Sequence, residues 1–415
     1  MYWGATHMKK YKLGAVGSYY QYQIRKIRRK QYMVLFSIGI FLVSVFVVTG
    51  RFDEDLQAIL SIGKERIEPL QESVYLIQPD IDYSIYVAPE VAKGIYIPAS
   101  KLKNYEDYIK LAKETEVNSF VIDVKDDTGH LTFATDNEVL IDKGSVLANP
   151  PIQDIQKLMS RLCEANIYPI ARVVAFKDSV VVKNEPEKAI KSLDGTTYKT
   201  AGNETWLNPY LKENWEYLLE VSKEAAKMGF KEIQFDYVRF HESMNSSRVI
   251  LDEEVSKSEI ITEFIKYICE NLQKEGIKVS ADVFGAVVLS DIDAEIVGQN
   301  FKEMSKYLDY ICPMIYPSHY AEGTFGIEYP HLEPYQIIYK TMKYGLNKMK
   351  DNEEEKKAVV RPWLQDFTIK SNEPYLAYGP EQIRDQIEGA NAAGVEEWLL
   401  WNGAGSYTTE GLKTK

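Results

Sequence analysis

The chain has 415 residues, 45% of them hydrophobic and 27% charged, which is an ordinary globular composition with ample length for one large domain. Residues 1–50 carry eight Lys and Arg and no Asp or Glu, so the net charge of −12 leaves −20 on residues 51–415. An acidic domain of this kind repels nucleic acid and tolerates neutral or cationic substrates, so we expect no nucleic-acid partner. The three cysteines are far apart and lack CxxC spacing, which argues against a disulfide framework or a zinc site.

An apolar segment at residues 31–50 follows a basic segment at residues 1–30. Its central run, Met33–Val48, has 16 residues, which lies between a signal peptide's apolar region and a transmembrane helix of about 20 residues. No Ala-x-Ala cleavage pattern follows, so we predict an uncleaved anchor, with a removed signal peptide as the alternative. A buried core helix would leave the basic segment unexplained. With the basic segment in the cytoplasm, a single-pass protein would expose the rest of the chain outside the cell membrane.

Residues 51–93 are polar and mixed, with Pro, Asp and Glu spread through them and no long apolar face. A segment of this composition cannot bury a core of its own. We therefore predict a stalk that joins the membrane segment to a domain at residues 94–415.

The domain at residues 94–415 alternates strand-like and helix-like segments. The predicted strands are Gly94–Pro98, Ser119–Val124, Ile167–Val174, Glu232–Tyr237, Lys278–Phe284, Tyr310–Tyr316, Ala358–Leu364 and Glu397–Asn402. The predicted helices are Tyr105–Glu116, Ile152–Ala165, Tyr210–Met228, Ser256–Glu275, Asn300–Leu308, Tyr335–Lys350 and Glu381–Ala393. Eight βα units predict an α/β fold, a closed (β/α)8 TIM barrel, in place of an open doubly wound sheet. Only residues 403–415 follow the last strand, so the last helix is expected to be reduced or missing, and no GxGxxG follows the first strand to support a nucleotide site.

Three of the predicted strands carry an acid one or two residues before their C-terminal end, at Asp123, Asp236 and Asp282. Active sites of such barrels lie at the C-terminal ends of the strands. Side chains alternate along a strand, so the apolar neighbours of each acid would face the outer helices while the acid faces the barrel axis. Three carboxylates are therefore predicted to meet at one mouth. Because like charges cannot all ionise freely at close range, at least one carboxyl is expected to keep its proton, as glycosidic bond cleavage requires.

Other polar and aromatic residues near the predicted strand ends are candidates for substrate binding. Lys125, Arg172 and Arg239 would either neutralise the acids or contact a substrate. Flat rings suit the C–H faces of sugars as well as plain packing. The ring candidates are Trp206, Tyr316, Trp363 and Trp401, and the amides of Gln365 and Asn402 beside two of them could hydrogen-bond sugar hydroxyls.

Two other chemistries have weaker support in the sequence. Asp126, Asp127 and His130 form a DDxxH string similar to that of metal-dependent deacetylases, but none of the five histidines supplies an HxxxH partner. No GxSxG marks a serine nucleophile. We therefore expect no metal and no cofactor, and keep a metal-dependent deacetylase as the last of the alternatives.

Eight short runs of the domain form a recognisable set: Gly94–Pro98, Phe120–Asp126, Leu207–Tyr210, Ile233–Phe240, Ala281–Gly285, Cys312–Tyr316, Arg361–Gln365 and Trp401–Gly403. The most specific is FDYVRF within Ile233–Phe240. These runs resemble the bacterial putative glycosyl hydrolase domain family, which belongs by similarity among TIM-barrel glycosidases of the α-amylase, α-galactosidase and endo-α-1,4-polygalactosaminidase types. The resemblance covers residue 94 to about residue 407. It implies a retaining α-glycosidase with Asp236 as nucleophile. Amylase-like relatives commonly place a Glu acid after the fifth strand, where this chain has Asp282, so Asp123 is the substitute candidate.

The leading hypothesis is a membrane-anchored, extracytoplasmic glycoside hydrolase that acts on a cell-surface or secreted polysaccharide. In this hypothesis Asp236 attacks the anomeric carbon and Asp282 or Asp123 protonates the leaving oxygen. The alternative is a non-catalytic barrel that binds envelope glycans as an adaptor, with its carboxylates held in salt bridges by Arg172, Lys125 or Arg239.

Overall fold

The computed structural model describes residues 88–350 and 358–415. The predicted anchor at residues 31–50 and nearly all of the predicted stalk at residues 51–93 lie outside the described residues. Within the described ranges, no helix combines the length and the apolar character needed to cross a bilayer.

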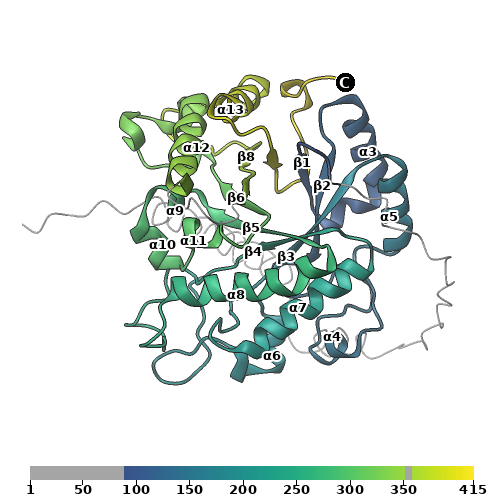
Figure 1. Ribbon diagram of the computed structural model, residues 1–415, viewed down its shortest axis with the longest axis vertical. Coiled ribbons are helices and arrows are strands. Elements are labelled where there is room, and N and C mark those ends of the chain that lie inside the picture. The colour runs from purple at the N-terminus through teal and green to yellow at the C-terminus, as the bar shows by residue number, and fades with distance from the viewer. Residues whose placement is uncertain (1–87, 351–357) are drawn as a thin grey trace, which may run out of the picture. The chain divides into compact units, whose positions relative to one another are not determined.

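The described residues form a closed parallel barrel surrounded by helices (Figure 1). Neighbouring strands pair in the order β1 to β6, and β9 pairs with β1 to complete the ring. The strands are β1 Lys93–Ile97, β2 Ser119–Lys125, β3 Tyr168–Val174, β4 Glu232–Asp236, β5 Lys278–Phe284, β6 Tyr310–Met314, β7 Val359–Val360, β8 Trp363–Gln365 and β9 Trp398–Trp401. The prediction of a (β/α)8 barrel is confirmed, because β7 and β8 are two parts of one barrel strand.

That seventh strand was predicted as continuous from Ala358 to Leu364 and is instead interrupted at Arg361 and Pro362. Proline has no backbone N–H for a ladder hydrogen bond, which accounts for a break at this position. The part before the break pairs with β6 through Val359 and Val360. The part after it pairs with β9 and also with β6, through Trp363 and Met314, and so closes the ring between these two strands.

The long helices of the model agree with the predicted ones to within three residues at either end, apart from one. They are α3 Tyr105–Glu114, α5 Ile155–Glu164, α7 Lys212–Lys227, α8 Lys257–Leu272, α12 Pro334–Lys350 and α13 Pro380–Ala393. The exception is the predicted Asn300–Leu308, of which only α11 Phe301–Met304 is helical. Shorter helices also occur in the connections: α4 Glu138–Asp142, α6 Val180–Asn184, α9 Gly285–Leu289 and α10 Asp291–Val297. Between β9 and Lys415 the described chain forms a 3-10 turn at Thr409–Gly411 and no α-helix.

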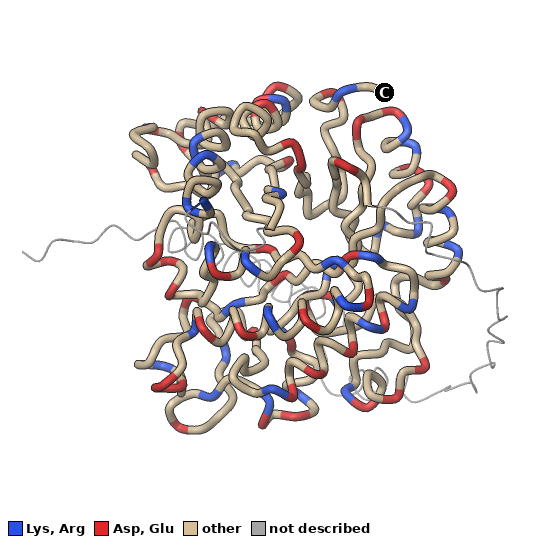
Figure 2. The backbone as a smooth tube through the Cα atoms, in the orientation of Figure 1, with Lys and Arg blue, Asp and Glu red and all other residues tan. Residues whose placement is uncertain are grey.

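Two hydrophobic clusters lie on opposite sides of the barrel wall. The larger one fills the space between strands and helices and includes the predicted outward residues of β2 and β5, such as Phe120 and Val279. The smaller one fills the barrel interior and includes Val121, Cys312 and Trp363. Period-two alternation therefore holds along the strands, as a strand buried on both faces requires. Acidic and basic residues are interspersed along the surrounding helices and loops (Figure 2).

Candidate active site

A pocket of about 330 Å³ opens at the C-terminal ends of the strands. Each of the eight barrel strands contributes a side chain to it, which is the place where barrels of this type build active sites. These side chains are Tyr96, Asp123, Arg172, Asp236, Asp282, Met314, Trp363 and Trp401. The lining is completed by Phe284, the last residue of β5, and by seven loop residues: Asp126, Asp127, Thr128, Tyr237, Arg239, Tyr316 and Gly403.

Arg172 on β3 is the cation at the centre of the pocket's acids. Its Nη1 donates to Asp123 Oδ1 at 2.7 Å, its Nη2 donates to Asp236 Oδ2 at 2.6 Å, and Nη2 also lies 3.0 Å from Asp127 Oδ1. Burial alone would lower the pKa of Arg172, but Asp236, Asp123 and Asp127 raise it well above its usual value. The guanidinium is therefore permanently charged and holds three carboxylates around it.

Asp236 at the end of β4 is surrounded by N–H donors. Its Oδ2 accepts from Arg172 Nε at 3.0 Å as well as from Nη2, and its Oδ1 accepts from the backbone N–H of Tyr237 at 2.6 Å. All of these groups donate N–H to Asp236 and none accepts. This set of donors suits a carboxylate whose orientation is fixed.

Asp282 on β5 lies in a different environment from Asp236. Its side chain is almost completely buried, and Trp363 Nε1–H donates to its Oδ1 at 2.6 Å. Burial, followed by the charge of Asp236, raises the pKa of Asp282 well above its usual value. A carboxyl of this kind retains its proton at pH values where an ordinary aspartate has lost it.

Asp123 on β2 has donors at both oxygens, because Tyr96 Oη–H donates to Oδ2 at 2.6 Å and Arg172 occupies Oδ1. Burial raises the pKa of Asp123 in spite of the opposing effects of Arg172 and Tyr96. Since both oxygens are engaged by the protein, Asp123 is less suited than Asp282 to donate a proton to a ligand.

Aromatic rings form one wall of the pocket. Trp401 on β9 stacks on Tyr96 with ring centroids 4.2 Å apart, and Trp363 meets Trp401 edge to face at 5.5 Å. The guanidinium carbon of Arg172 lies 5.7 Å from both the Tyr96 and the Trp401 ring centres. These rings lie beside the acids, and Tyr316 also lines the pocket, where it packs against His319 and Phe367.

Four residues predicted to bind substrate do not line the pocket. Lys125 is completely buried and pairs with Asp178 at 2.8 Å, because the register of β2 shifts between Asp123 and Lys125 and turns its side chain away from the axis. Trp206 lies behind the pocket wall, under the guanidinium of Arg239.

The remaining two are held by loop backbone. Gln365 Oε1 accepts from the backbone N–H and the hydroxyl of Ser318. Asn402 donates to the backbone oxygen of Asp366 at 2.6 Å and closes a turn with Ala404. Both amides are thus engaged in positioning loops at the barrel mouth.

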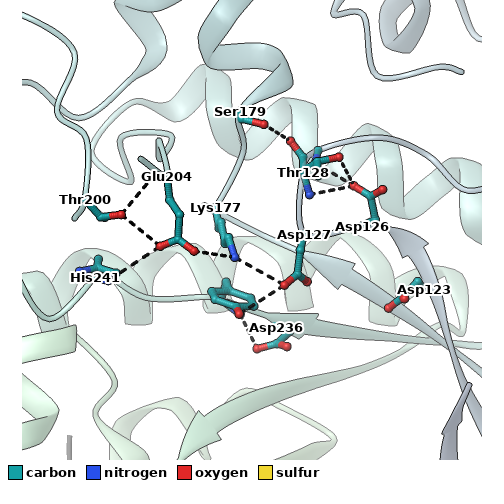
Figure 3. Close-up of polar contacts among 12 residues, drawn as sticks. Asp123, Asp126, Asp127, Thr128, Lys177, Ser179, Thr200, Glu204, Asp236 and His241 are labelled. Atoms are coloured by element: carbon teal, nitrogen blue, oxygen red, sulfur yellow. Dashed lines mark hydrogen bonds and ion pairs between the residues drawn. The ribbon is translucent and has the colours of Figure 1, made fainter. Parts of the chain in front are cut away.

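Eight of the sixteen residues that line the pocket were not among the predicted site residues, and three of them contact the acids or the network around them. Tyr96 lies in the GIYIP run of β1, Asp127 in the DDxxH string, and Tyr237 directly after Asp236. Figure 3 shows Asp127 linked to Lys177 and, through Lys177, to Glu204 and His241. Across the residues that the model describes, no three His, Cys, Asp or Glu side chains are arranged to hold a metal ion.

The comparisons with known proteins agree with this geometry. The model of a family described as a putative glycosyl hydrolase domain matches residues 94–407, which is most of the chain. The chain belongs to this family. A search of curated proteins found no match.

Solved structures of other proteins are similar to parts of the chain. The glycoside hydrolase domain of PgaB (BpsB) from Bordetella bronchiseptica is 12% identical with a TM-score of 0.56, over 76% of this chain and 95% of its own. A hypothetical protein from Ruminiclostridium thermocellum is 35% identical with a TM-score of 0.42, over 46% of this chain and 97% of its own. An α-galactosidase from Thermus thermophilus is 11% identical with a TM-score of 0.47, over 77% of this chain and 59% of its own. The PgaB domain supports the barrel fold, and the family model supports the glycosyl hydrolase assignment.

Proposed function

We propose that this family member hydrolyses glycosidic bonds with Asp236 as nucleophile and Asp282 as general acid and base. The observation that carries the proposal is the contrast between two neighbouring carboxyls in one pocket. Asp236 is held by Arg172 as an acceptor, whereas burial and the charge of Asp236 raise the pKa of Asp282. One ionised and one protonated carboxyl is the pair that glycosidases use.

The proposed reaction has two steps and retains the anomeric configuration. A carboxylate oxygen of Asp236 bonds to the anomeric carbon while the glycosidic C–O bond breaks and the proton of Asp282 passes to the leaving oxygen. Asp282, now ionised, then takes a proton from a water molecule whose oxygen bonds to the anomeric carbon as the ester to Asp236 breaks. Arg172 and Tyr96 keep Asp123 in place beside the developing positive charge of the sugar.

The charge of the pocket favours neutral or cationic sugars as substrates. Five acids line it against two arginines. Arg172 is paired with three of those acids, and Arg239 donates to Phe240 O and Glu242. An incoming carboxylate or phosphate would therefore meet net negative charge and arginines already engaged by protein acceptors.

The proposed substrate is a cell-surface or secreted polysaccharide, and its location rests on the N-terminal pattern. The basic residues 1–30 and the apolar residues 31–50 support a single-pass anchor with the barrel outside, or a removed signal peptide as the alternative. Residues 51–93 would then separate the barrel from the membrane.

The proposal is tested with the full chain and with Asp236→Asn. Wild type is incubated with 4-nitrophenyl α- and β-glycosides and with a polysaccharide panel, and released nitrophenol or reducing ends are measured. We expect wild type to turn over at least one compound and Asp236→Asn to lose turnover while its binding to the same glycan persists. NMR of the first-formed product anomer then distinguishes retention from inversion. Absence of turnover by wild type on every compound would contradict the proposal.

A glycan-binding adaptor remains the second candidate, because Arg172 engages both Asp123 and Asp236 as that hypothesis predicted. Lys125 does not pair with the pocket acids, as that hypothesis also allowed, since it pairs with Asp178. Asp282 is outside the arginine's ion pairs, and this favours the enzyme. Glycan binding by wild type without any turnover would support the adaptor.

A further inference from the structure

Tyr237 has an unusual backbone for its residue type. Its φ is 51°, in the left-handed region that side chains other than Gly, Asn and Asp rarely adopt. Among the described residues other than glycine, Asn166, Asn203 and Phe325 share this feature, but Tyr237 is the one that lines the pocket. Strand alternation would place its ring against the outer helices. The left-handed turn instead places it on the pocket wall directly after Asp236.

The surroundings of Tyr237 hold it in this conformation. The ammonium of Lys177 lies 4.6 Å from the centre of its ring, and the guanidinium carbon of Arg239 lies 5.2 Å from it. Its hydroxyl lies 3.4 Å from Asp127 Oδ2. Lys177 is itself paired with Glu204 at 3.0 Å and with Asp127 (Figure 3). The ring is therefore held by a network anchored in two loops. Strained conformations persist where the surrounding contacts over-determine them, and they concentrate at functional sites.

The backbone N–H of Tyr237 is one of the two groups that fix Asp236. It donates to Oδ1 at 2.6 Å while Arg172 holds Oδ2. This N–H belongs to the peptide between Asp236 and Tyr237. A residue that cannot adopt positive φ at position 237 would relax by rotating the adjoining peptides, and the N–H would leave Oδ1.

We propose that Tyr237 is a positioning residue for the nucleophile, acting through its left-handed backbone conformation, which the contacts with Lys177 and Arg239 maintain. This inference rests on the proposed function, because it assigns Tyr237 a role through Asp236. It predicts that tolerance of positive φ at position 237 controls kcat, separately from the loss of the ring.

The test compares Tyr237→Val with Tyr237→Asn in the full chain, on the 4-nitrophenyl glycoside that wild type hydrolyses fastest. Both variants lack the ring, but a β-branched Val disfavours positive φ whereas Asn tolerates it. We expect kcat of the Val variant to be at least about tenfold below that of the Asn variant, since a misplacement of about 1 Å can cost ~10²-fold. KM should be similar in the two, because both have lost the same ring contacts. If Tyr237→Val does not fold, Tyr237→Ala against Tyr237→Gly makes the same comparison.

Phe325 supplies a matched control, being an aromatic residue with φ 55° outside the pocket lining. Phe325→Val and Phe325→Asn should differ in thermal midpoint while sharing the same kcat. Equal kcat for the two folded Tyr237 variants would overturn this inference alone, provided that Asp236→Asn is inactive. Failure of wild type to turn over any glycoside, or full activity of Asp236→Asn, would instead remove the proposed function and this inference with it.

Discussion

Two arginines lie inside the barrel, and each of them gathers carboxylates, but at opposite ends of the strands. Arg172 holds Asp123 and Asp236 at the C-terminal ends and lines the pocket. Arg361 lies near the N-terminal ends, where its Nη1 donates to Glu232 Oε1 at 2.8 Å and its Nε donates to Glu397 Oε2 at 2.6 Å. Strand β4 joins the two networks, because it begins at Glu232 and ends at Asp236.

The two networks have similar chemistry, and both arginines are buried, but they differ in whether they line the pocket. The guanidinium of Arg361 lies 3.6 Å from the centre of the Tyr310 ring, and Glu232 also accepts from Ser280. No member of this lower network lines the pocket, whereas Asp236 and its neighbour Asp282 do. The proposed function assigns the chemistry to the upper network and leaves the lower one to stabilise the barrel, which is how the two ends of TIM barrels generally divide these roles.

The largest difference in activity is expected between two single variants in which the acid at one or the other end of β4 is replaced by its amide. Asp236→Asn should lower kcat/KM by at least about 10³-fold, because loss of a nucleophile removes the covalent route. Glu232→Gln is the matched control and should keep kcat/KM near the wild-type value while lowering the urea midpoint. Similar activity losses in the two folded variants would show that the division between the ends is wrong.

Next in size is the stability effect of the lower arginine. Arg361→Met leaves Glu232 and Glu397 buried without their cation, and removal of one partner of a buried pair costs about 3–5 kcal/mol of unfolding free energy. Urea unfolding monitored by tryptophan fluorescence measures it. Arg172→Met should lose stability for the same reason and should in addition lower kcat/KM, since Asp236 loses its orientation. A stable Arg361→Met protein would remove the stabilising role from the lower network.

The pH dependence of activity and of stability tests the assignment of Asp282 as the general acid. Burial and Asp236 raise the pKa of Asp282, so the protonated form is the active one and kcat/KM should fall as pH rises through that pKa. The free energy of unfolding should fall in the same direction. The carboxyl of Asp282 ionises near pH 4 in the unfolded chain, so burying it costs more stability as pH rises from about 4 to its folded pKa. Asp282→Asn should therefore lose activity, by about 10²-fold or more for a general acid, and gain stability over wild type as pH increases. Asp123→Asn is the comparison, and an alkaline limb that disappears only in that variant would move the acid role to Asp123.

The smallest predicted effect concerns the charge of the pocket. A 4-nitrophenyl glucuronide should have kcat/KM at least about tenfold below the matching glucoside, because one net negative charge about 10 Å away contributes roughly 1.7 kcal/mol at an effective dielectric of 20. The difference should shrink in Asp127→Asn, which removes the most exposed carboxylate bonded to Arg172, and at high salt. Preference for the glucuronide would contradict the proposed substrate class.

Much of the barrel could be predicted because the governing patterns are local. Successive side chains of a strand point to opposite faces, so the apolar residues of β2, β4 and β5 that pack against the helices put Asp123, Asp236 and Asp282 on the inner face, at one mouth. The βα repeat likewise predicted the closed ring.

Only the tertiary structure decided which polar groups meet. Lys125 leaves the pocket because β2 shifts its register there, and Tyr237 enters it through a positive φ, so a simple alternation rule fails at both positions. Arg172 neutralises Asp123 and Asp236 because three strands bring their side chains within 3 Å. The protonation tendency of Asp282 likewise arises from its burial and from the charge of Asp236, a residue 46 positions earlier in the chain. Such contacts depend on the packing of segments distant in sequence, which a local pattern does not contain.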